Sequence, residues 1–263
     1  LPIYPLALQV GGNNPVDLAL CARIAKDRGY DQMNLNVGCP SSRVQSGQFG
    51  ACLMKQPTLV ADCVNAMNNA TDLPVTVKTR IGVDEQDSYE ALQQFIATVA
   101  QAGCDTFIIH ARKAWLKGLS PRENRLIPPL RYDIVYQLKR DFSHLRIIIN
   151  GGINDSLSVM QHMQHVDGVM IGREAYRNPL FIAQVQKLLF AGSHDPVLNR
   201  RAILLHYLSY VREQYALGVP LRHLIQHLVG FFQGEKGAKA WRRCLSENVK
   251  TKNDLELLFS KVA

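Results

Sequence analysis

Cys39 lies on a turn at the end of an expected strand, where its thiol could take part in chemistry. The run Asn34-Leu-Asn-Val-Gly-Cys-Pro40 begins as an apolar strand pattern and breaks at Gly38-Cys39-Pro40. A tract rich in Ser, Gly and Gln follows before the next helical pattern, which is typical of a loop. A thiol on such a loop would reach a substrate above the strand ends, whereas an inert loop thiol is the alternative.

Polar residues or glycines follow every strand that the pattern predicts. In chain order they are Gln9, Asn36 with Cys39, Lys78 with Arg80, His110 with Arg112, Asn150-Gly151-Gly152, and Gly172-Arg173. In a barrel of parallel strands, functional groups lie at the carboxyl ends of the strands. Any one of these residues alone would be explained as a strand cap or a satisfied core side chain. Six in the same position favour a functional site.

The glycines after the last two expected strands predict a phosphate site. Asn150-Gly151-Gly152 and Gly172-Arg173 each precede a helical pattern, and glycine lets backbone N–H groups approach an anion closely. Lys78 and His110, from the middle strands, would then lie under the body of a phosphate-bearing cofactor. A cation there would favour the reduced form of a ring system that gains negative charge.

Alternating strand and helix patterns predict the fold that positions these groups. Strands are expected over residues 5–10, 33–37, 74–79, 105–110, 146–150 and 168–171. Helices are expected over residues 16–28, 57–69, 87–102, 132–142 and 156–165. Apolar strands separated by helices of this length favour a parallel sheet with outer helices. We expect a TIM (β/α)8 barrel whose first two strands precede residue 1, and a complete six-stranded doubly wound sheet is the alternative.

No strand pattern remains after about residue 196. Residues 198–215, 221–232, 236–246 and 254–262 read as four helices, with glycines at positions 218 and 234 as stops. We therefore expect two domains, a barrel over residues 1–190 and a helical domain over residues 191–263.

Charge and cysteine usage narrow the class of partner. The net charge is +8, and residues 191–263 hold 11 Lys and Arg against 6 Asp and Glu. A polyanionic partner explains this excess, and solvated basic helices without a partner are the alternative. The six cysteines show no metal-like spacing, which favours reduced thiols in the cytoplasm and no metal. No apolar run is long enough to cross a membrane.

These motifs closely resemble the tRNA-dihydrouridine synthases. The matching segments are Asn36-Val-Gly-Cys-Pro40, Val77-Lys-Thr-Arg-Ile-Gly82, His110-Ala-Arg112, Asn150-Gly-Gly152 and Gly172-Arg173. The segment 112–125 with Ile127-Pro-Pro-Leu130 resembles the A-type bacterial branch in particular. The resemblance extends over essentially the whole chain.

The resemblance implies an FMN-binding barrel, residues 1–190, with a helical tRNA-binding domain, residues 191–263. It implies that NADPH reduces FMN and that a hydride then passes to C6 of a uridine in the D-loop of tRNA, at position twenty or its neighbour. It further implies a monomeric cytoplasmic enzyme with no metal and no membrane attachment.

The resemblance also assigns roles to single residues. Cys39 would protonate C5 of the uracil as general acid, and Asn36 would help to hold that base. Gln9, Lys78 and His110 would hold the flavin ring and ribityl chain, and the phosphate would lie among Asn150, Gly151, Gly152, Gly172 and Arg173. Arg43, Arg112, Lys113 and Lys117 would contact the tRNA.

Two alternatives stay open at this point. Members of the resembled family begin with a strand carrying Ala-Pro-Met and a second strand, neither of which is present here, so the chain could be a truncated, inactive tRNA-binding remnant. Another phosphate-binding barrel enzyme, such as an aldolase with Lys78 as Schiff-base amine, is the second alternative.

Overall fold

The computed structural model describes residues 5–190 and 200–247, and beyond these residues 249, 251, 253, 254 and 256. The chain forms two compact units. The first comprises Leu1–Gly152 and Met160–Met170, and the second comprises Ile153–Val159 and Ile171–Ala263. Each unit is described by itself below.

The first unit contains a parallel sheet of six strands in sequential order, β1-β2-β3-β4-β5-β6. The strands are β1 (Ala7–Val10), β2 (Gln32–Asn36), β3 (Val75–Arg80), β4 (Thr106–His110), β5 (Arg146–Asn150) and β6 (Gly168–Met170). A doubly wound sheet would reverse its strand order partway along, so that alternative is wrong. Sequential parallel strands with helices between them are the arrangement of a (β/α) barrel, and the predicted fold class is confirmed.

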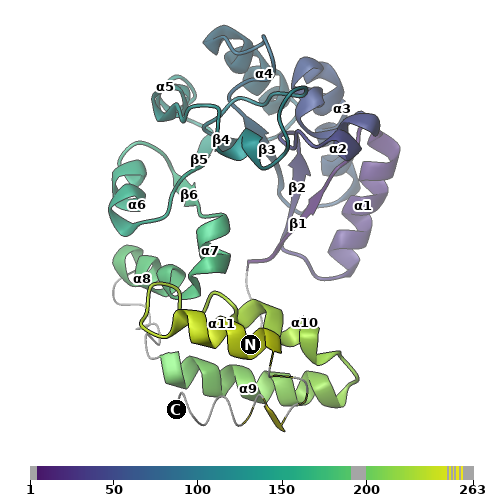
Figure 1. Ribbon diagram of the computed structural model, residues 1–263. Helices are drawn as coiled ribbons and strands as arrows, with labels where there is room; N and C mark the ends of the chain where they lie inside the picture. The colour runs from purple at the N-terminus through teal and green to yellow at the C-terminus, as the bar shows by residue number, and fades with distance from the viewer. Residues whose placement is uncertain are drawn as a thin grey trace. The chain divides into compact units, whose positions relative to one another are not determined.

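Four long helices connect these strands and lie on the outer side of the sheet (Figure 1). They are α1 (Pro15–Asp27), α3 (Pro57–Ala70), α4 (Tyr89–Gln101) and α5 (Tyr132–Asp141). Local sequence explains where they begin. The Asn14 side chain accepts hydrogen bonds from the backbone of Val16 and Asp17, and the Ser88 hydroxyl accepts one from Ala91, which satisfies N–H groups that a helix start leaves unpaired. All four helices and six strands lie within two residues of their predicted ends.

The register gives the sheet two chemically different faces. One face is apolar and fully buried, with Met33, Leu35, Val77, Phe107 and Ile149 among its members. Because side chains alternate along a strand, the residues between them point to the opposite face. The apolar face is covered by the long helices and forms the core of the unit. The opposite face carries the polar side chains of the candidate site.

Two short helices interrupt the tract after Cys39 that was expected to be a loop. They are α2 (Ser42–Ser46) and the 3-10 helix η1 (Gly50–Lys55), and a further 3-10 helix, η2 (Glu123–Arg125), lies in the loop after β4. The Ser41 hydroxyl caps α2 by accepting from the Val44 backbone. The tract is thus structured, because Ser41 supplies a cap and the buried side chains of Leu53 and Met54 anchor η1.

The second unit is helical in its described residues. Its helices are α7 (Arg173–Arg177), α8 (Pro179–Leu189), α9 (Arg200–Ala216), α10 (Leu221–Ile225), η3 (Gln226–Leu228) and α11 (Ala238–Glu247), while α6 (Ser156–Met163) is divided between the units. The predicted helix over 221–232 is shorter than expected. The predicted helix over 254–262 lies almost entirely outside the described residues.

A hydrophobic cluster holds α9, α10, η3 and α11 together. It includes Leu208, Val211, Leu224, Leu228 and Trp241. The Trp241 indole donates a hydrogen bond of 2.8 Å to the Leu228 carbonyl, so the polar atom of this buried ring is satisfied. Over the described part of the chain, no helix is both long and apolar enough to span a bilayer.

Candidate active site

A chain of hydrogen bonds crosses the polar face of β1, β2 and β3. The Gln9 amide donates to Asn34 Oδ1 at 2.7 Å, and the Asn34 amide donates to the Thr76 hydroxyl at 2.8 Å. Gln32 also donates to Thr76, at 2.9 Å. Asn34 and Thr76 are buried, and a buried polar group is costly unless it is bonded. This network holds Gln9, one of the predicted cofactor residues, in a fixed position.

Lys78 and Asn150 meet on the same face from strands that are not neighbours. The Lys78 amine donates to Asn150 Oδ1 at 3.2 Å, and the Asn150 amide donates to the Met170 carbonyl at 2.8 Å. Burial, and secondarily the charge of Arg80, lowers the pKa of Lys78 to about 8. The structure thus brings together two predicted cofactor residues that are 72 positions apart in the sequence.

His110 and the Asn150-Gly151-Gly152 turn lie against each other. His110 is paired with Asn150 across the β4–β5 ladder. Gly151 and Gly152 have φ angles of 121° and 72°, which only glycine adopts readily. A Cβ atom on Gly151 would lie 2.7 Å from the His110 ring, and the Tyr132 hydroxyl donates to the Gly151 carbonyl at 2.7 Å. Both the backbone conformation and the available space therefore require glycine at position 151.

Cys39 lies on a turn whose backbone is bonded on all sides. Asn36 Oδ1 accepts from the backbone N–H groups of Gly38 and Cys39, at 3.1 Å each. The Cys39 carbonyl accepts from the Ala51 backbone at 2.9 Å. The thiol donates to the Ser41 hydroxyl at 3.6 Å. The sulfur thus lies beside a hydroxyl, on a turn that backbone hydrogen bonds hold in place.

Arg80 ties the Cys39 turn to the loop after β4. Its guanidinium is buried and donates to the carbonyls of Gly38 at 2.9 Å, Lys113 at 3.0 Å and Asn124 at 3.0 Å. Burial lowers the pKa of Arg80 to about 10. The sequence marked Arg80 only as a companion of Lys78.

The residues present fit a bound anion. Arg80 is buried, and Lys78, two residues earlier on the same strand, is partly buried near it. In the described ranges, neither forms an ion pair with a carboxylate. Buried charges ordinarily need a partner of opposite sign, so electron-rich groups of a ligand suit this end of the strands. Among the residues that the structure describes, no group of His, Cys, Asp and Glu is arranged to hold a metal ion.

The four predicted tRNA contacts differ in how they are held. Arg43 and Lys117 are exposed. Arg112 donates to the Pro128 carbonyl. Lys113 forms an ion pair with Asp87 at 2.7 Å and lies 4.1 Å from the centre of the Trp115 ring. A phosphate contact by Lys113 would therefore compete with the Asp87 carboxylate.

Gly172 and Arg173, the remaining predicted phosphate residues, belong to the second unit. Gly172 directly precedes α7, and its carbonyl accepts from the Ala175 backbone at 3.1 Å. Their role in binding a phosphate stays a prediction.

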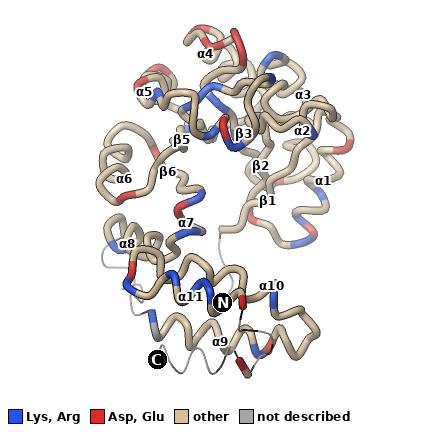
Figure 2. Tube along the Cα trace, in the orientation of Figure 1, with Lys and Arg blue, Asp and Glu red and all other residues tan. Residues whose placement is uncertain are grey.

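The second unit carries an exposed basic surface on and around α11, which we call the α11 basic surface. Figure 2 shows Lys and Arg segments along this helix. Its members are Lys236, Lys239, Arg242 and Arg243, all exposed, and Arg222 is a further exposed cation, on α10. Arg243 is paired with Glu247 at 3.6 Å, and such exposed pairs contribute little energy. Most of this charge is therefore available to an anionic partner.

The buried residues Asn34 and Thr76 and the partly buried Gln32 were missed from the sequence, as were Gln45 and Asp84. A signal for the first group exists in Gln32-Met-Asn-Leu-Asn36, where polar and apolar residues alternate strictly. Such alternation predicts one polar and one apolar face. The inner face of the sheet is thus polar at β1–β3. The interior of a barrel is more usually filled by branched apolar residues.

Comparison with known proteins gives a consistent result. The profile of the dihydrouridine synthase family (Dus) matches residues 3–263. The tRNA-dihydrouridine(20/20a) synthase of Shewanella oneidensis is 61% identical over 245 residues, which are 93% of this chain and 73% of that protein. The protein of the same description from Vibrio vulnificus is 56% identical over 262 residues, 99% of this chain and 80% of that protein. That of Escherichia coli K12 is 56% identical over 257 residues, 97% of this chain and 74% of that protein.

Proposed function

We propose that this chain, which belongs to the dihydrouridine synthase family and is a flavin-dependent oxidoreductase, reduces uridine to 5,6-dihydrouridine at positions 20 and 20a of tRNA. FMN is the proposed flavin, and NADPH is the proposed reductant. The observation that carries the proposal is the identity of 56–61% to relatives described by this activity, over 93–99% of the chain. The family match leaves no role for the aldolase alternative.

Cys39 is the proposed proton donor. A bound reduced flavin would supply the hydride to C6 of the uracil. C5 then needs a proton, which the Cys39 thiol provides as its S–H bond breaks and a C5–H bond forms, leaving a thiolate. The hydrogen bond between the thiol and Ser41 and the bonded Gly38-Cys39-Pro40 turn support this role, because they hold the sulfur in one place.

Lys78, His110 and Gln9 are the proposed partners of the flavin ring and ribityl chain. Lys78 would place a cation beside a ring that gains negative charge on reduction, and a nearby anion would raise its depressed pKa again. Asn150, Gly151 and Gly152 are proposed to contact the phosphate group, and the prediction for Gly172 and Arg173 is the same. Asn36 would contact the uracil through its amide nitrogen, because its oxygen already accepts from the Cys39 turn. One N–H of that amide donates to Gln9 Oε1 at 3.4 Å, and the other would serve the base.

Residues 191–263 are proposed as the tRNA-binding domain and residues 1–190 as the catalytic domain. The α11 basic surface supports the first assignment, since phosphate neutralisation supplies most of the affinity of proteins for nucleic acids. Arg43, Arg112, Lys113 and Lys117 are proposed to contact the tRNA nearer to the reacting base. A cytoplasmic monomer is the proposed state of the enzyme.

The proposal is tested with the purified protein and tRNA transcripts that lack modifications. We expect a yellow protein whose released cofactor is FMN, and dihydrouridine at positions 20 and 20a after incubation with NADPH. A uridine-to-cytidine replacement at both positions is the matched control and should leave the tRNA unreduced. A colourless protein that binds tRNA without reducing it would establish the inactive remnant instead.

A further inference from the structure

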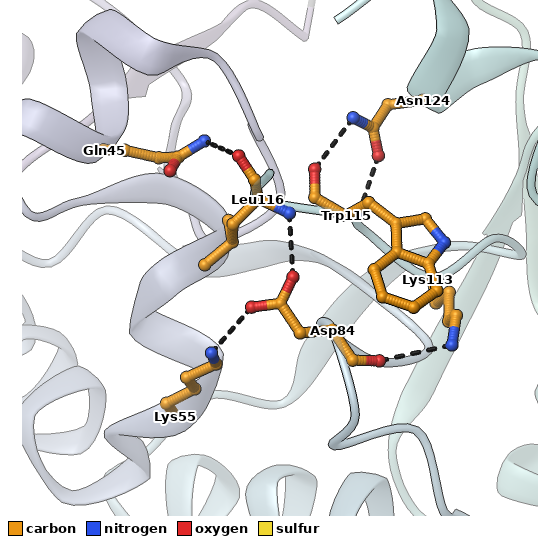
Figure 3. A network of polar contacts seen from close by, with 7 residues as sticks. All are labelled: Gln45, Lys55, Asp84, Lys113, Trp115, Leu116 and Asn124. Atoms are coloured by element: carbon orange, nitrogen blue, oxygen red, sulfur yellow. Dashed lines mark hydrogen bonds and ion pairs between the residues drawn. The ribbon is translucent and has the colours of Figure 1, made fainter. Parts of the chain in front are cut away.

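The peptide of Leu116 is held from two sides by side chains of two other segments. Its carbonyl accepts from Gln45 Nε2 at 2.7 Å, and its N–H donates to Asp84 Oδ1 at 2.8 Å. Leu116 belongs to the loop after β4, Gln45 to α2, and Asp84 to the turn after β3. Figure 3 shows the three side by side, with Leu116 between the other two. We call the loop after β4 the basic loop, because it carries Arg112, Lys113, Lys117, Arg122 and Arg125.

Gln45 connects this peptide directly to the Cys39 turn. The same amide nitrogen donates to the Pro40 carbonyl at 2.8 Å. Both N–H groups of the Gln45 amide are thus used. One donates to the carbonyl of Pro40, the residue after Cys39, and the other to the carbonyl of Leu116. The three consecutive carbonyls of residues 38, 39 and 40 are bonded by Arg80, Ala51 and Gln45 respectively, so removal of Gln45 frees one of three points of attachment.

Asp84 links the Leu116 peptide to the far end of the segment that runs from Cys39 to Lys55. Its second carboxylate oxygen forms an ion pair with Lys55 at 2.7 Å, at the end of η1. Asp84 has a φ angle of 49°, a left-handed conformation that Asp and Asn adopt more readily than most residues. The sequence from Cys39 to Lys55 is therefore attached to the Leu116 peptide near both of its ends.

We propose that Gln45 and Asp84 are positioning residues for the proton transfer: acting through the Leu116 peptide, they fix the Cys39 turn against the basic loop that is proposed to contact tRNA. This inference rests on the proposed function for its kinetic consequence, but its structural content concerns only the Cys39 turn. A displacement of about 1 Å at a reacting group lowers a rate by about 10²-fold, so loss of this attachment slows the step in which Cys39 takes part.

Gln45→Met is the primary variant, because it removes both donated hydrogen bonds and keeps the side-chain length. Gln86→Met is the matched control, since Gln86 is exposed in the same turn as Asp84 and its side chain forms no hydrogen bond within the described residues. Asp84→Asn is the second variant. It keeps the residue type that tolerates the left-handed conformation and removes the charge that pairs with Lys55. Glu85→Gln, an exposed neighbour, is its control.

The first measurement is the rate at which iodoacetamide alkylates Cys39, followed by mass spectrometry of the peptide that contains it. It needs neither cofactor nor tRNA. We expect Gln45→Met to raise this rate at least about 3-fold, because the turn is less firmly held, and Gln86→Met to leave it unchanged.

The second measurement separates the two half-reactions of the enzyme. In Gln45→Met we expect bleaching of the flavin by NADPH at the wild-type rate, and tRNA-dependent reoxidation slowed about 10- to 100-fold. The solvent deuterium isotope effect on reoxidation should rise, since proton transfer becomes more nearly rate-limiting. The Asp84→Asn effect should be smaller, because the amide oxygen of the introduced side chain can still accept from the Leu116 N–H and only the pairing with Lys55 is lost. The double variant should be less than additive, because both changes loosen the same segment, residues 39–55.

Wild-type rates of alkylation and of reoxidation in Gln45→Met would overturn the inference. So would equal slowing of both half-reactions together with flavin loss and unchanged alkylation, which would mark Gln45 as important for stability only. A wild-type protein that forms no dihydrouridine would instead overturn the proposed function, while the alkylation rates would still decide whether Gln45 holds the Cys39 turn.

Discussion

The amine of Lys78 lies 3.2 Å from the amide oxygen of Asn150, and both side chains stand on the polar face of the sheet. Burial and the nearby charge of Arg80 make the position of the Lys78 amine unfavourable for a cation. A neutral amide relieves this only partly, because a hydrogen bond to a neutral acceptor does not replace a counter-ion. The pair is thus arranged for a ligand that brings negative charge.

Replacement of Lys78 by Met is expected to stabilise the flavin-free protein at pH 7. The pKa of Lys78 falls from 10.5 to about 8 on folding, so the unfolded chain binds more protons between these values and the free energy of unfolding rises with pH across this window. At 1.36 kcal/mol per pKa unit, the cost of the partly buried cation at pH 7 is about 3 kcal/mol. In urea unfolding, the gain of Lys78→Met over wild type should be greatest at pH 7 and shrink towards pH 10.

The matched control is Lys117→Met, because Lys117 is exposed. The difference in the free energy of unfolding between Lys117→Met and wild type should be the same at pH 7 and at pH 10. If Lys78→Met were less stable than wild type at pH 7 in the absence of flavin, the cation would have a partner that compensates for its burial. We also expect Lys78→Met to lose FMN during purification, which absorbance at the flavin band measures.

Replacement of Cys39 by Ala is expected to lower the rate of dihydrouridine formation by about 10²–10⁴-fold, the usual contribution of a general acid. Flavin content and flavin reduction by NADPH should stay at wild-type levels, since the thiol donates to Ser41 rather than to a predicted cofactor residue. Single-turnover oxidation of the reduced enzyme by tRNA gives the rate. Cys52→Ala, a thiol bonded to the Phe49 carbonyl, is the control and should be fully active. An active Cys39→Ala enzyme would assign the proton to another group.

Gly151→Ala is expected to abolish flavin retention. The φ angle of 121° disfavours any side chain, and a Cβ atom would lie 2.7 Å from the His110 ring and 2.9 Å from Leu130. Backbone strain alone costs about 1–3 kcal/mol. Gly29→Ala separates the two effects, because Gly29 also has a positive φ, 76°, with no atom within 4 Å of a Cβ. We expect both variants to lower the midpoint of thermal unfolding but only Gly151→Ala to lose FMN. Loss of FMN from both would contradict a specific role for the turn.

Lys117→Gln is expected to weaken tRNA binding and to reduce its salt dependence. A cation that neutralises one phosphate contributes about 0.7–0.9 to the slope of log K against log salt. Filter binding between 50 and 200 mM salt measures this slope. Arg23→Gln, an exposed charge on α1, changes the net charge equally and should leave the slope unaltered. Equal effects of both variants would mean that net charge alone, rather than the basic loop, governs binding.

Local patterns in the sequence were enough to predict the elements of the barrel. Most strands from Ala7–Val10 to Gly168–Met170 are short and rich in apolar residues, with a polar residue or a glycine at or just after the end. The helices α1 and α4 begin at side-chain caps, Asn14 and Ser88. Because the carboxyl ends of parallel strands share one edge, the same reasoning predicted that Lys78, His110 and Asn150 would lie close together. The motif around Cys39 was specific enough to indicate the family.

Only the tertiary structure determined which side chains meet across the chain. Lys78 and Asn150, or Gln45 and Leu116, lie 72 and 71 positions apart, and no local pattern encodes a contact between loops. The tract after Cys39 was expected to be a loop, yet it contains α2 and η1, Gln45 attaches it to the Leu116 peptide, and Asp84 attaches that peptide to Lys55. Propensity and periodicity act over a few residues, whereas these hydrogen bonds depend on the sheet register that brings the loops after β2, β3 and β4 to one edge. Sequence therefore determined what kinds of groups the site holds, and the register decided how they are held.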